Sequence, residues 1–337
     1  MTAAIISVDG SSLTAREFHE GIVAAGRPVV LRDIAAAWPV TKAARKSPGA
    51  LRDYLLGFDK GEPVRAMIGP PGIKGRFFYN EALTGFNFRT ESLRLNAALD
   101  HLLEATDQAQ AMAFAIQSLQ LWSALPGFDR DNRLQLLPPT IEPRAWLGNQ
   151  VTVAAHHDPS ENVACVVAGQ RVFTLFPPAE VANLYPGPFE LTPAGPTISM
   201  VDFDAPDLAR YPRFAKALDQ ALVAELSAGD AIYIPYLWWH HVRSTEPLNL
   251  LVNYWWSPPS PAVGHPLEAM VHAMASIRAL PPHPRAAWEA MFRHYVFSGD
   301  PAGEHLAEAR RGIQGDPPSP EALTWAQQLL ASRFRKP

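Results

Sequence analysis

The chain has 337 residues, of which 47% are hydrophobic and 18% are charged. This composition excludes a largely disordered protein and predicts either two modest domains or one large domain with extensions. The 29 basic and 33 acidic residues nearly balance, which argues against strong electrostatic attraction to nucleic acid or to an anionic membrane surface.

The sequence also bears on the compartment. Its single cysteine, Cys165, cannot form an internal disulfide, and this fits a reducing environment. The N-terminal sequence MTAAIISVDGSSLTAREF has no basic segment followed by a long apolar run, so we expect no signal peptide. No stretch approaches the ~20 apolar residues of a transmembrane helix. We therefore expect a cytoplasmic protein.

Residues 1–109 predict a mixed α/β region. Thr14 and Glu17 have the spacing of a capping box, and Ser47 before Pro48 is typical of a second helix start. Leucines at helical spacing predict a third helix. Helices are expected from Thr14 to near Gly26, over 47–56 and over 90–105. Strands are expected over 28–34, 62–68 and 76–81.

Residues 110–258 are rich in short apolar segments that are separated by Gly, Pro and Asn. This pattern is typical of a β-sandwich or a small barrel. Strands are expected over residues 111–118, 144–149, 150–158, 161–169, 170–178, 230–235 and 248–256.

Residues 259–337 predict helices with apolar stripes. These stripes could pack on the outside of the barrel, or they could form a dimer interface with a second copy of the chain. The stripes consist of Leu267, Met270, Val271 and Met274, then Trp288, Met291, Phe292 and Tyr295, and finally Leu323, Leu329 and Leu330 after a Ser319-Pro320 cap.

Two pairs of adjacent histidines suggest a metal site. In HHDPSEN (156–162), an extended backbone places His156 and Asp158 on one face and His157 on the other. Downstream, GDAIYIPYLWWHHVRS (229–244) contains His240 and His241. Two histidines and one carboxylate form the facial triad of non-haem Fe(II) oxygenases. Alternation alone does not decide which histidine of each pair binds, and a solvated turn is the alternative for either pair.

Several ordered motifs within residues 140–257 resemble the JmjC-type, cupin-like 2-oxoglutarate oxygenases, including their asparaginyl hydroxylases. The motifs are HHDPSENVACVVAGQRVFTLFPP (156–178), VDFDAPDLARYPRF (201–214), GDAIYIPYLWWHHV (229–242) and VNYWW (252–256). The resemblance implies a mainly β fold. It would have a double-stranded β-helix (jelly-roll or cupin) core over 110–258, an α/β N-terminal region over 1–109 and a helical C-terminal region over 259–337.

The same resemblance implies particular site residues. His156, Asp158 and His240 fall on the iron ligands. Arg171 replaces the lysine that binds the distal carboxylate of 2-oxoglutarate, and a guanidinium can grip a carboxylate with two donors.

Three further residues are implied to surround the cofactors. Asn162 and Asn253 would contact 2-oxoglutarate or its neighbours at the iron. Trp255 would line the mouth of the site. His157 and His241 are expected to be packed or hydrogen-bonded residues nearby.

Two positions depart from the family pattern. Ala115, two residues before Gln117, stands where the family often has a tyrosine, and Val153 stands where it has Thr or Ser. A regular strand would place Thr152 on the face of His156, which could restore the missing hydroxyl.

The resemblance implies hydroxylation of a C–H bond with Fe(II), 2-oxoglutarate and O₂. The implied substrate is a protein or peptide side chain, bound in a groove beside Trp255, Phe78 and Tyr79. A small molecule, a modified tRNA base and a non-enzymatic, metal-binding cupin are the alternatives. The charge balance argues against nucleic acid, and Ala115 and Val153 keep the non-enzymatic alternative open.

Overall fold

The computed structural model describes residues 3–105, 111–193, 195–257 and 263–334. The chain divides into two compact units, Met1–Pro258 and Pro259–Pro337. Within the described residues, no helix is long and apolar enough to cross a membrane.

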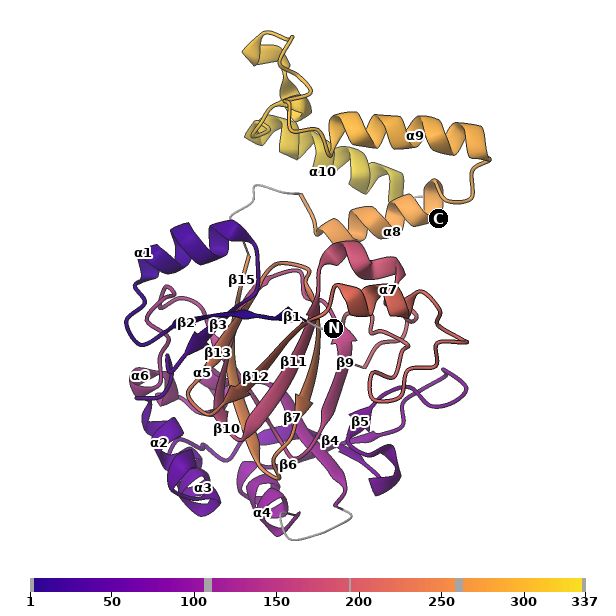
Figure 1. Ribbon diagram of the computed structural model, residues 1–337. Helices are drawn as coiled ribbons and strands as arrows, with labels where there is room; N and C mark the ends of the chain where they lie inside the picture. Colours follow the sequence, from indigo (N-terminus) through magenta and orange to yellow (C-terminus); the bar gives the residue numbers. More distant parts are fainter. Residues whose placement is uncertain (1–2, 106–110, 194, 258–262, 335–337) are drawn as a thin grey trace. The chain divides into compact units, whose positions relative to one another are not determined.

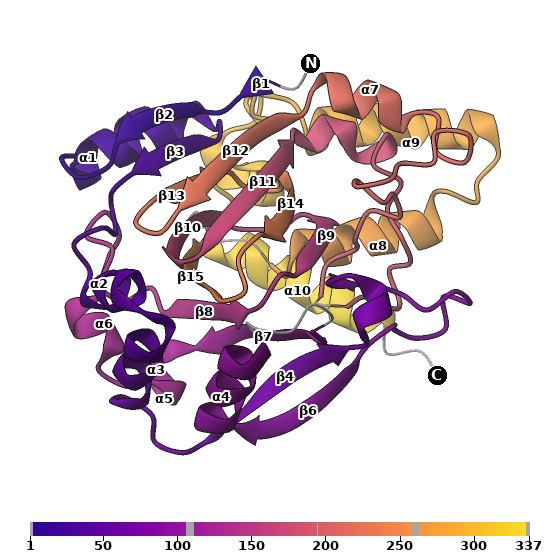
Figure 2. The same cartoon turned by 60° about the horizontal axis from the view of Figure 1, so that its bottom comes forward.

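Two β-sheets form the core of the first unit (Figures 1 and 2). One has six strands in the order β1-β12-β11-β14-β9-β5, and the other has nine in the order β2-β3-β13-β10-β15-β8-β7-β4-β6. The strands are β1 (Ala3–Ala4), β2 (Ile6–Asp9), β3 (Val29–Arg32), β4 (Pro63–Gly69), β5 (Arg76–Phe77), β6 (Arg89–Arg94), β7 (Ala113–Gln120), β8 (Pro143–Gly148), β9 (Thr152–His156), β10 (Glu161–Ala168), β11 (Gln170–Phe176), β12 (Leu222–Ser227), β13 (Ala231–Ile234), β14 (Trp239–Ser244) and β15 (Asn249–Trp256). This arrangement confirms the mainly β, jelly-roll fold.

The inner faces of the two sheets pack against each other. Ala164 and Val166 of β10 share one buried cluster with Phe173 of β11, from the other sheet. Because side chains alternate along a strand, Val163 and Cys165 point the opposite way, into a second buried cluster. The inward-facing residues of both sheets therefore line the space between them.

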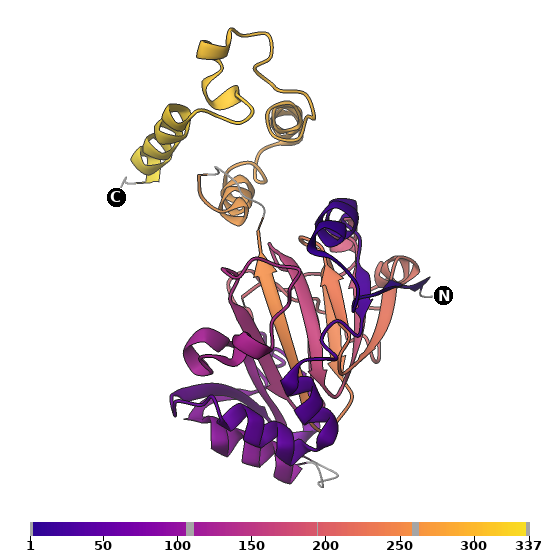
Figure 3. The ribbon, with the colours of Figure 1, turned by 90° about the vertical axis from the view of Figure 1, so that its left-hand side faces the viewer.

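Helices cover the outer face of the nine-stranded sheet, where they share the second cluster with Val163 (Figure 3). The two predicted helix starts are confirmed. Thr14 and Glu17 form a capping box, and the hydroxyl of Ser47 accepts a hydrogen bond from Ala50 N. The N-terminal helices are α1 (Ala15–Glu17), continued as a π-helix over Phe18–Val23, then α2 (Pro39–Lys46), α3 (Pro48–Leu56) and α4 (Leu95–Ala105).

Two expectations about elements were wrong, and the strand that contains His240 was not predicted. Residues 90–94 belong to strand β6, because they pair with β4, and the helix starts only at Leu95. The strand expected over 76–81 is limited to Arg76–Phe77. His240 lies inside β14, a strand that was not predicted from the sequence.

The other elements of the first unit are short. They are α5 (Leu121–Ala124), α6 (Phe128–Asp131), α7 (Phe214–Asp219) and 3-10 turns at Pro71–Ile73 and Pro178–Ala182.

The second unit is helical, with α8 (Pro266–Ser276), α9 (Pro282–Tyr295) and α10 (Pro320–Phe334). Two 3-10 turns, Glu308–Arg310 and Gly312–Gln314, precede α10. Neither α8 nor α9 contains a buried residue. The predicted apolar stripes are thus largely exposed within this unit.

Candidate metal centre

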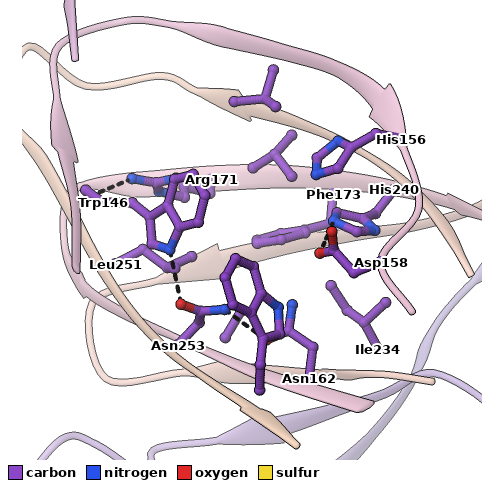
Figure 4. Close-up of a pocket in the computed structure, with 14 residues that line it drawn as sticks. Trp146, His156, Asp158, Asn162, Arg171, Phe173, Ile234, His240, Leu251 and Asn253 are labelled. Carbon is purple, nitrogen blue, oxygen red and sulfur yellow. Dashed lines mark hydrogen bonds and ion pairs between the residues drawn. The ribbon is translucent and has the colours of Figure 1, made fainter. Parts of the chain in front are cut away.

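Two strands and one loop bring the three predicted ligands together (Figure 4). His156 ends β9 and pairs directly with His240 of β14. Asp158 lies in the following loop, where its carbonyl accepts a hydrogen bond from Leu237 N at 3.0 Å. One ligand atom from each of the three side chains lies within 4.8 Å of the others, and Asp158 Oδ2 is 3.6 Å from His240 Nε2.

The backbone orients both imidazoles. Nδ1 of His156 lies 3.0 Å from the Ala154 carbonyl, and Nδ1 of His240 lies 3.1 Å from the Trp238 carbonyl. A carbonyl can only accept, so each bonded ring carries its proton on Nδ1 and leaves the lone pair of Nε2 free. Burial lowers the pKa of His240 to about 4, which keeps this ring neutral.

The donor set fits a divalent transition metal. Asp158 Oδ2 is buried and has no hydrogen-bond partner among the described residues. An unpaired buried carboxylate oxygen is costly unless something binds it. Two neutral imidazoles and one carboxylate on one side of an ion are the ligands of non-haem Fe(II).

The neighbouring histidines point away from this cluster, as alternation predicted. His157 packs edge-on against Trp239, with ring centroids 4.6 Å apart, and His241 stacks on Phe203 at 4.6 Å. Burial lowers the pKa of both, that of His241 to about 4. The structure therefore pairs His156 with His240 and leaves the other two as packed residues.

A cavity between the sheets extends from the three ligands to Arg171 on β11. The Arg171 side chain is buried, and its Nη2 donates to the Trp146 carbonyl at 3.1 Å. Its Nε has no partner, and it belongs to no ion pair within the described residues. Burial lowers the pKa of Arg171 to about 10, yet the group stays charged at neutral pH. A buried cation without an anion fits a carboxylate ligand.

Polar groups of the nine-stranded sheet line the same cavity. Trp146 Nε1 donates to Asn253 Oδ1 at 2.8 Å, and Asn253 Nδ2 donates to Asn162 Oδ1 at 3.1 Å. The Trp255 ring meets Trp146 edge-on, with centroids 5.8 Å apart. All three residues predicted around the cofactors therefore lie at this cavity. Trp146 was missed, because nothing in RAWLGN distinguishes an inward tryptophan from a packed one.

The expectation that Thr152 supplies the hydroxyl missing at Val153 is wrong. The pairing of β9 with β14 shifts between His240 and Val242, so β9 contains one extra residue between Val153 and His156. This irregularity puts Val153 at the cavity, and Thr152 is buried elsewhere. Ala115 does not line the cavity either; it packs in a separate apolar cluster.

The groove predicted beside Trp255, Phe78 and Tyr79 also has different walls in the structure. A second pocket adjoins two of the predicted ligands, His156 and Asp158, and includes Trp255, Gln117 and Phe77. Phe78 and Tyr79 line a separate, more polar pocket, and the Tyr79 hydroxyl donates to the Leu191 carbonyl. Phe77, the last residue of β5, lies at the pocket beside His156 and Asp158, and the strand ends before Phe78 and Tyr79.

Sequence comparison agrees with this geometry. Residues 15–261 match the cupin-like domain family. The chain belongs to the cupin-like domain family. The predicted JmjC resemblance is confirmed by similar proteins that carry JmjC names, such as JmjC domain-containing protein D of Dictyostelium discoideum. The asparaginyl hydroxylases remain a looser comparison.

Three relatives of this cupin-like chain illustrate the range of similarity. The human bifunctional peptidase and (3S)-lysyl hydroxylase JMJD7 is 28% identical over 72% of this chain and 81% of its own length. Lysine-specific demethylase 8 of Danio rerio is 27% identical over 68% of this chain and 53% of its own length. Lysine-specific demethylase JMJ31 of Arabidopsis thaliana is 38% identical over 33% of this chain and only 20% of its own length.

Proposed function

We propose that this protein is an Fe(II)- and 2-oxoglutarate-dependent oxygenase that hydroxylates a C–H bond of a protein side chain. The observation that carries the proposal is one cavity that contains two imidazoles, a carboxylate and a buried guanidinium that forms no ion pair among the described residues. The relatives named as a hydroxylase and as demethylases of lysine support a protein substrate. When bound, iron and 2-oxoglutarate supply the activation of O₂, with succinate and CO₂ as the co-products.

The protein contributes ligands, orientation and shielding from water. His156, Asp158 and His240 hold the metal, and the carbonyls of Ala154 and Trp238 fix the two rings. Backbone hydrogen bonds of this kind keep ligand geometry constant during turnover.

Residues on the inward faces of both sheets bind the co-substrate. Arg171 binds the distal carboxylate of 2-oxoglutarate with the donors that it does not use on Trp146. Asn253 and Asn162 are hydrogen-bonded to each other on the opposite wall. Their side chains are therefore positioned before the co-substrate binds. Trp255 and Trp146 shield the cavity from solvent.

We also propose that the protein is a homodimer that pairs through its C-terminal helices. Exposed large apolar side chains cluster in this unit, and burying them in a second copy is the simplest way to remove them from water. They are Leu267, Met270, Val271, Met274, Trp288, Met291, Tyr295, Val296, Phe297, Ile313, Trp325, Leu329 and Leu330.

Succinate production tests the oxygenase. The protein is incubated with Fe(II), ascorbate and 2-oxoglutarate, and succinate is measured without added substrate, because such oxygenases turn over slowly in uncoupled form. We expect succinate from the wild type and a loss of more than about 100-fold in Asp158→Ala, since removing a ligand exceeds the 10–100-fold cost of losing a neighbouring residue.

The matched control is Asp53→Ala, which removes a carboxylate that is 76% exposed on α3. It should retain wild-type succinate production. Addition of Mn(II) should raise the Tm of the wild type and of this control, but not of Asp158→Ala. Metal binding without any succinate would favour the non-enzymatic cupin instead.

A further inference from the structure

A second arginine lies on the cavity face of the nine-stranded sheet. Arg144 of β8 directly opposes Asn253 of β15 and precedes Trp146 by two residues. Opposed residues of adjacent strands share a face, and so do residues two apart in one strand. The Arg144 guanidinium carbon lies 5.5 Å from the centroid of the Trp255 ring, and Trp255 lines both pockets beside the predicted ligands.

This guanidinium is held from two sides. Trp255 attracts it through a cation–π contact, and its Nη1 donates to Ser118 Oγ at 2.9 Å. Ser118 has a φ of +55°, a left-handed conformation that serine seldom adopts. It lies where the pairing of β7 with β8 shifts between Ile116 and Leu119. Strained residues of this kind concentrate at ligand-binding positions.

Arg144 has hydrogen-bond donors that are not used within the described structure. A guanidinium carries five N–H groups, and within the described parts of the chain Arg144 uses them for one hydrogen bond, to Ser118. No ion pair among the described residues includes Arg144. A half-buried cation that is fixed in place and lacks a carboxylate fits an anionic ligand that comes from outside the chain.

The pocket that the Trp255 ring shares with His156 and Asp158 is almost free of charge. Among the described residues that line it, Asp158 is the one carboxylate, and it faces the metal. Gln117 offers an amide, and the remaining walls are mainly apolar: Met67, Phe77, Val153, Ala154, Pro193, Pro196, Ile198 and Trp255. A lysine or arginine side chain would lose water here without gaining a counter-charge.

We propose that Arg144 determines specificity by binding a carboxylate of the polypeptide substrate, close in sequence to an uncharged residue that is hydroxylated. This inference rests on the proposed function. A single fixed cation suits one acidic side chain, whereas a nucleic acid backbone needs several basic groups along its path. The buried Arg171 is assigned to 2-oxoglutarate, so the two arginines bind different carboxylates.

Short synthetic peptides test the proposal. They vary the central residue between aliphatic, amide and lysine side chains, and the flanking residues between acidic, neutral and basic. The full chain is incubated with each peptide, Fe(II), ascorbate and 2-oxoglutarate, and the gain of one oxygen atom is measured by mass spectrometry. We expect peptides with acidic flanks and an uncharged centre to react roughly ten-fold faster or more, the size of one charge-assisted hydrogen bond.

Variants of Arg144 show whether this residue recognises the charge of the flanking residues in the peptide. Arg144→Gln should lose the preference for acidic flanks, and Arg144→Glu should shift it to basic flanks, an effect that general structural damage does not produce. Arg45→Gln removes the same charge from α2, an outer-face helix, where the side chain also makes one hydrogen bond, to the Ala228 carbonyl. This control should keep the wild-type preference.

Each other outcome is decisive. An acidic preference that survives in Arg144→Glu overturns the role of Arg144, and faster oxidation of lysine-centred peptides overturns the uncharged target. Oxidation of an RNA oligonucleotide in place of every peptide overturns the polypeptide class. Succinate from the wild type without any oxidised peptide overturns this inference and leaves the oxygenase standing. Absence of succinate overturns the proposed function itself.

Discussion

Arg171 shows how a single residue can be placed for function at a cost in stability. Its charge is buried, and one carbonyl is its observed hydrogen-bond partner. Burial of a charge without a counter-ion disfavours the charged form, which is why the pKa of Arg171 falls to about 10. In the proposed function, a bound carboxylate ligand supplies the counter-charge. The ligand-free protein should therefore be less stable than one with an apolar residue at this position.

Replacement of Arg171 by Met separates the two effects. We expect the ligand-free Arg171→Met variant to gain about 1–3 kcal/mol in the free energy of unfolding, because a buried unpaired charge is removed. The same variant should raise the KM for 2-oxoglutarate by about 10–100-fold. Thermal unfolding and succinate production at varied 2-oxoglutarate concentration measure the two quantities.

Arg171→Lys is the matched comparison, since it keeps the charge. It should retain more of the affinity for 2-oxoglutarate than Arg171→Met and gain none of the stability. An unchanged KM in Arg171→Met would show that the co-substrate carboxylate binds elsewhere.

At the scale of elements, alternation along strands predicted much of the site. It separated His156 from His157 and placed Asp158 beside His156, and the apolar runs located β9, β10 and β15. It failed where a strand is irregular, because a local extra residue in β9 reverses the phase and has no signature in the letters QVTVAAHHD.

The other errors of prediction also have identifiable structural causes. β14 begins with Trp239 and His240. Its start does not show the alternation of apolar and polar residues that identifies a strand. Residues 90–94 fit a helical pattern, but their pairing with β4, 23 to 31 positions earlier, overrides that preference. Non-local pairing of this kind cannot be read from a local window.

The irregularity in β9 leads to a prediction about Val153. Because Val153 faces the cavity, Val153→Thr should place a hydroxyl near the co-substrate and lower the KM for 2-oxoglutarate by about two- to ten-fold, the value of one neutral hydrogen bond. Thr152→Val is the control and should leave this KM unchanged, since Thr152 does not line the cavity. If the two variants behave the other way round, the phase of β9 inferred from the structure is wrong.

For the whole molecule, the second unit lacks a core of its own. Among its described residues, the exposed apolar side chains far outnumber the buried ones, of which Ala322 is one. Together they expose on the order of 1,000 Å², compared with roughly 800 Å² that each partner contributes to a standard interface. This area suffices for a stable pairing of two identical chains. The proposed dimer therefore accounts for helices that would otherwise gain little from folding.

The mass in solution decides whether this pairing occurs. Light scattering after size exclusion should give twice the chain mass of 37.0 kDa. Trp325→Glu should give the single mass, because a carboxylate would replace a ring that is 53% exposed on α10 and that the proposed interface would bury. Leu208→Glu, at a similarly exposed position in the first unit, should remain dimeric. A wild type of single mass would instead mean that the C-terminal helices find their partner within their own chain.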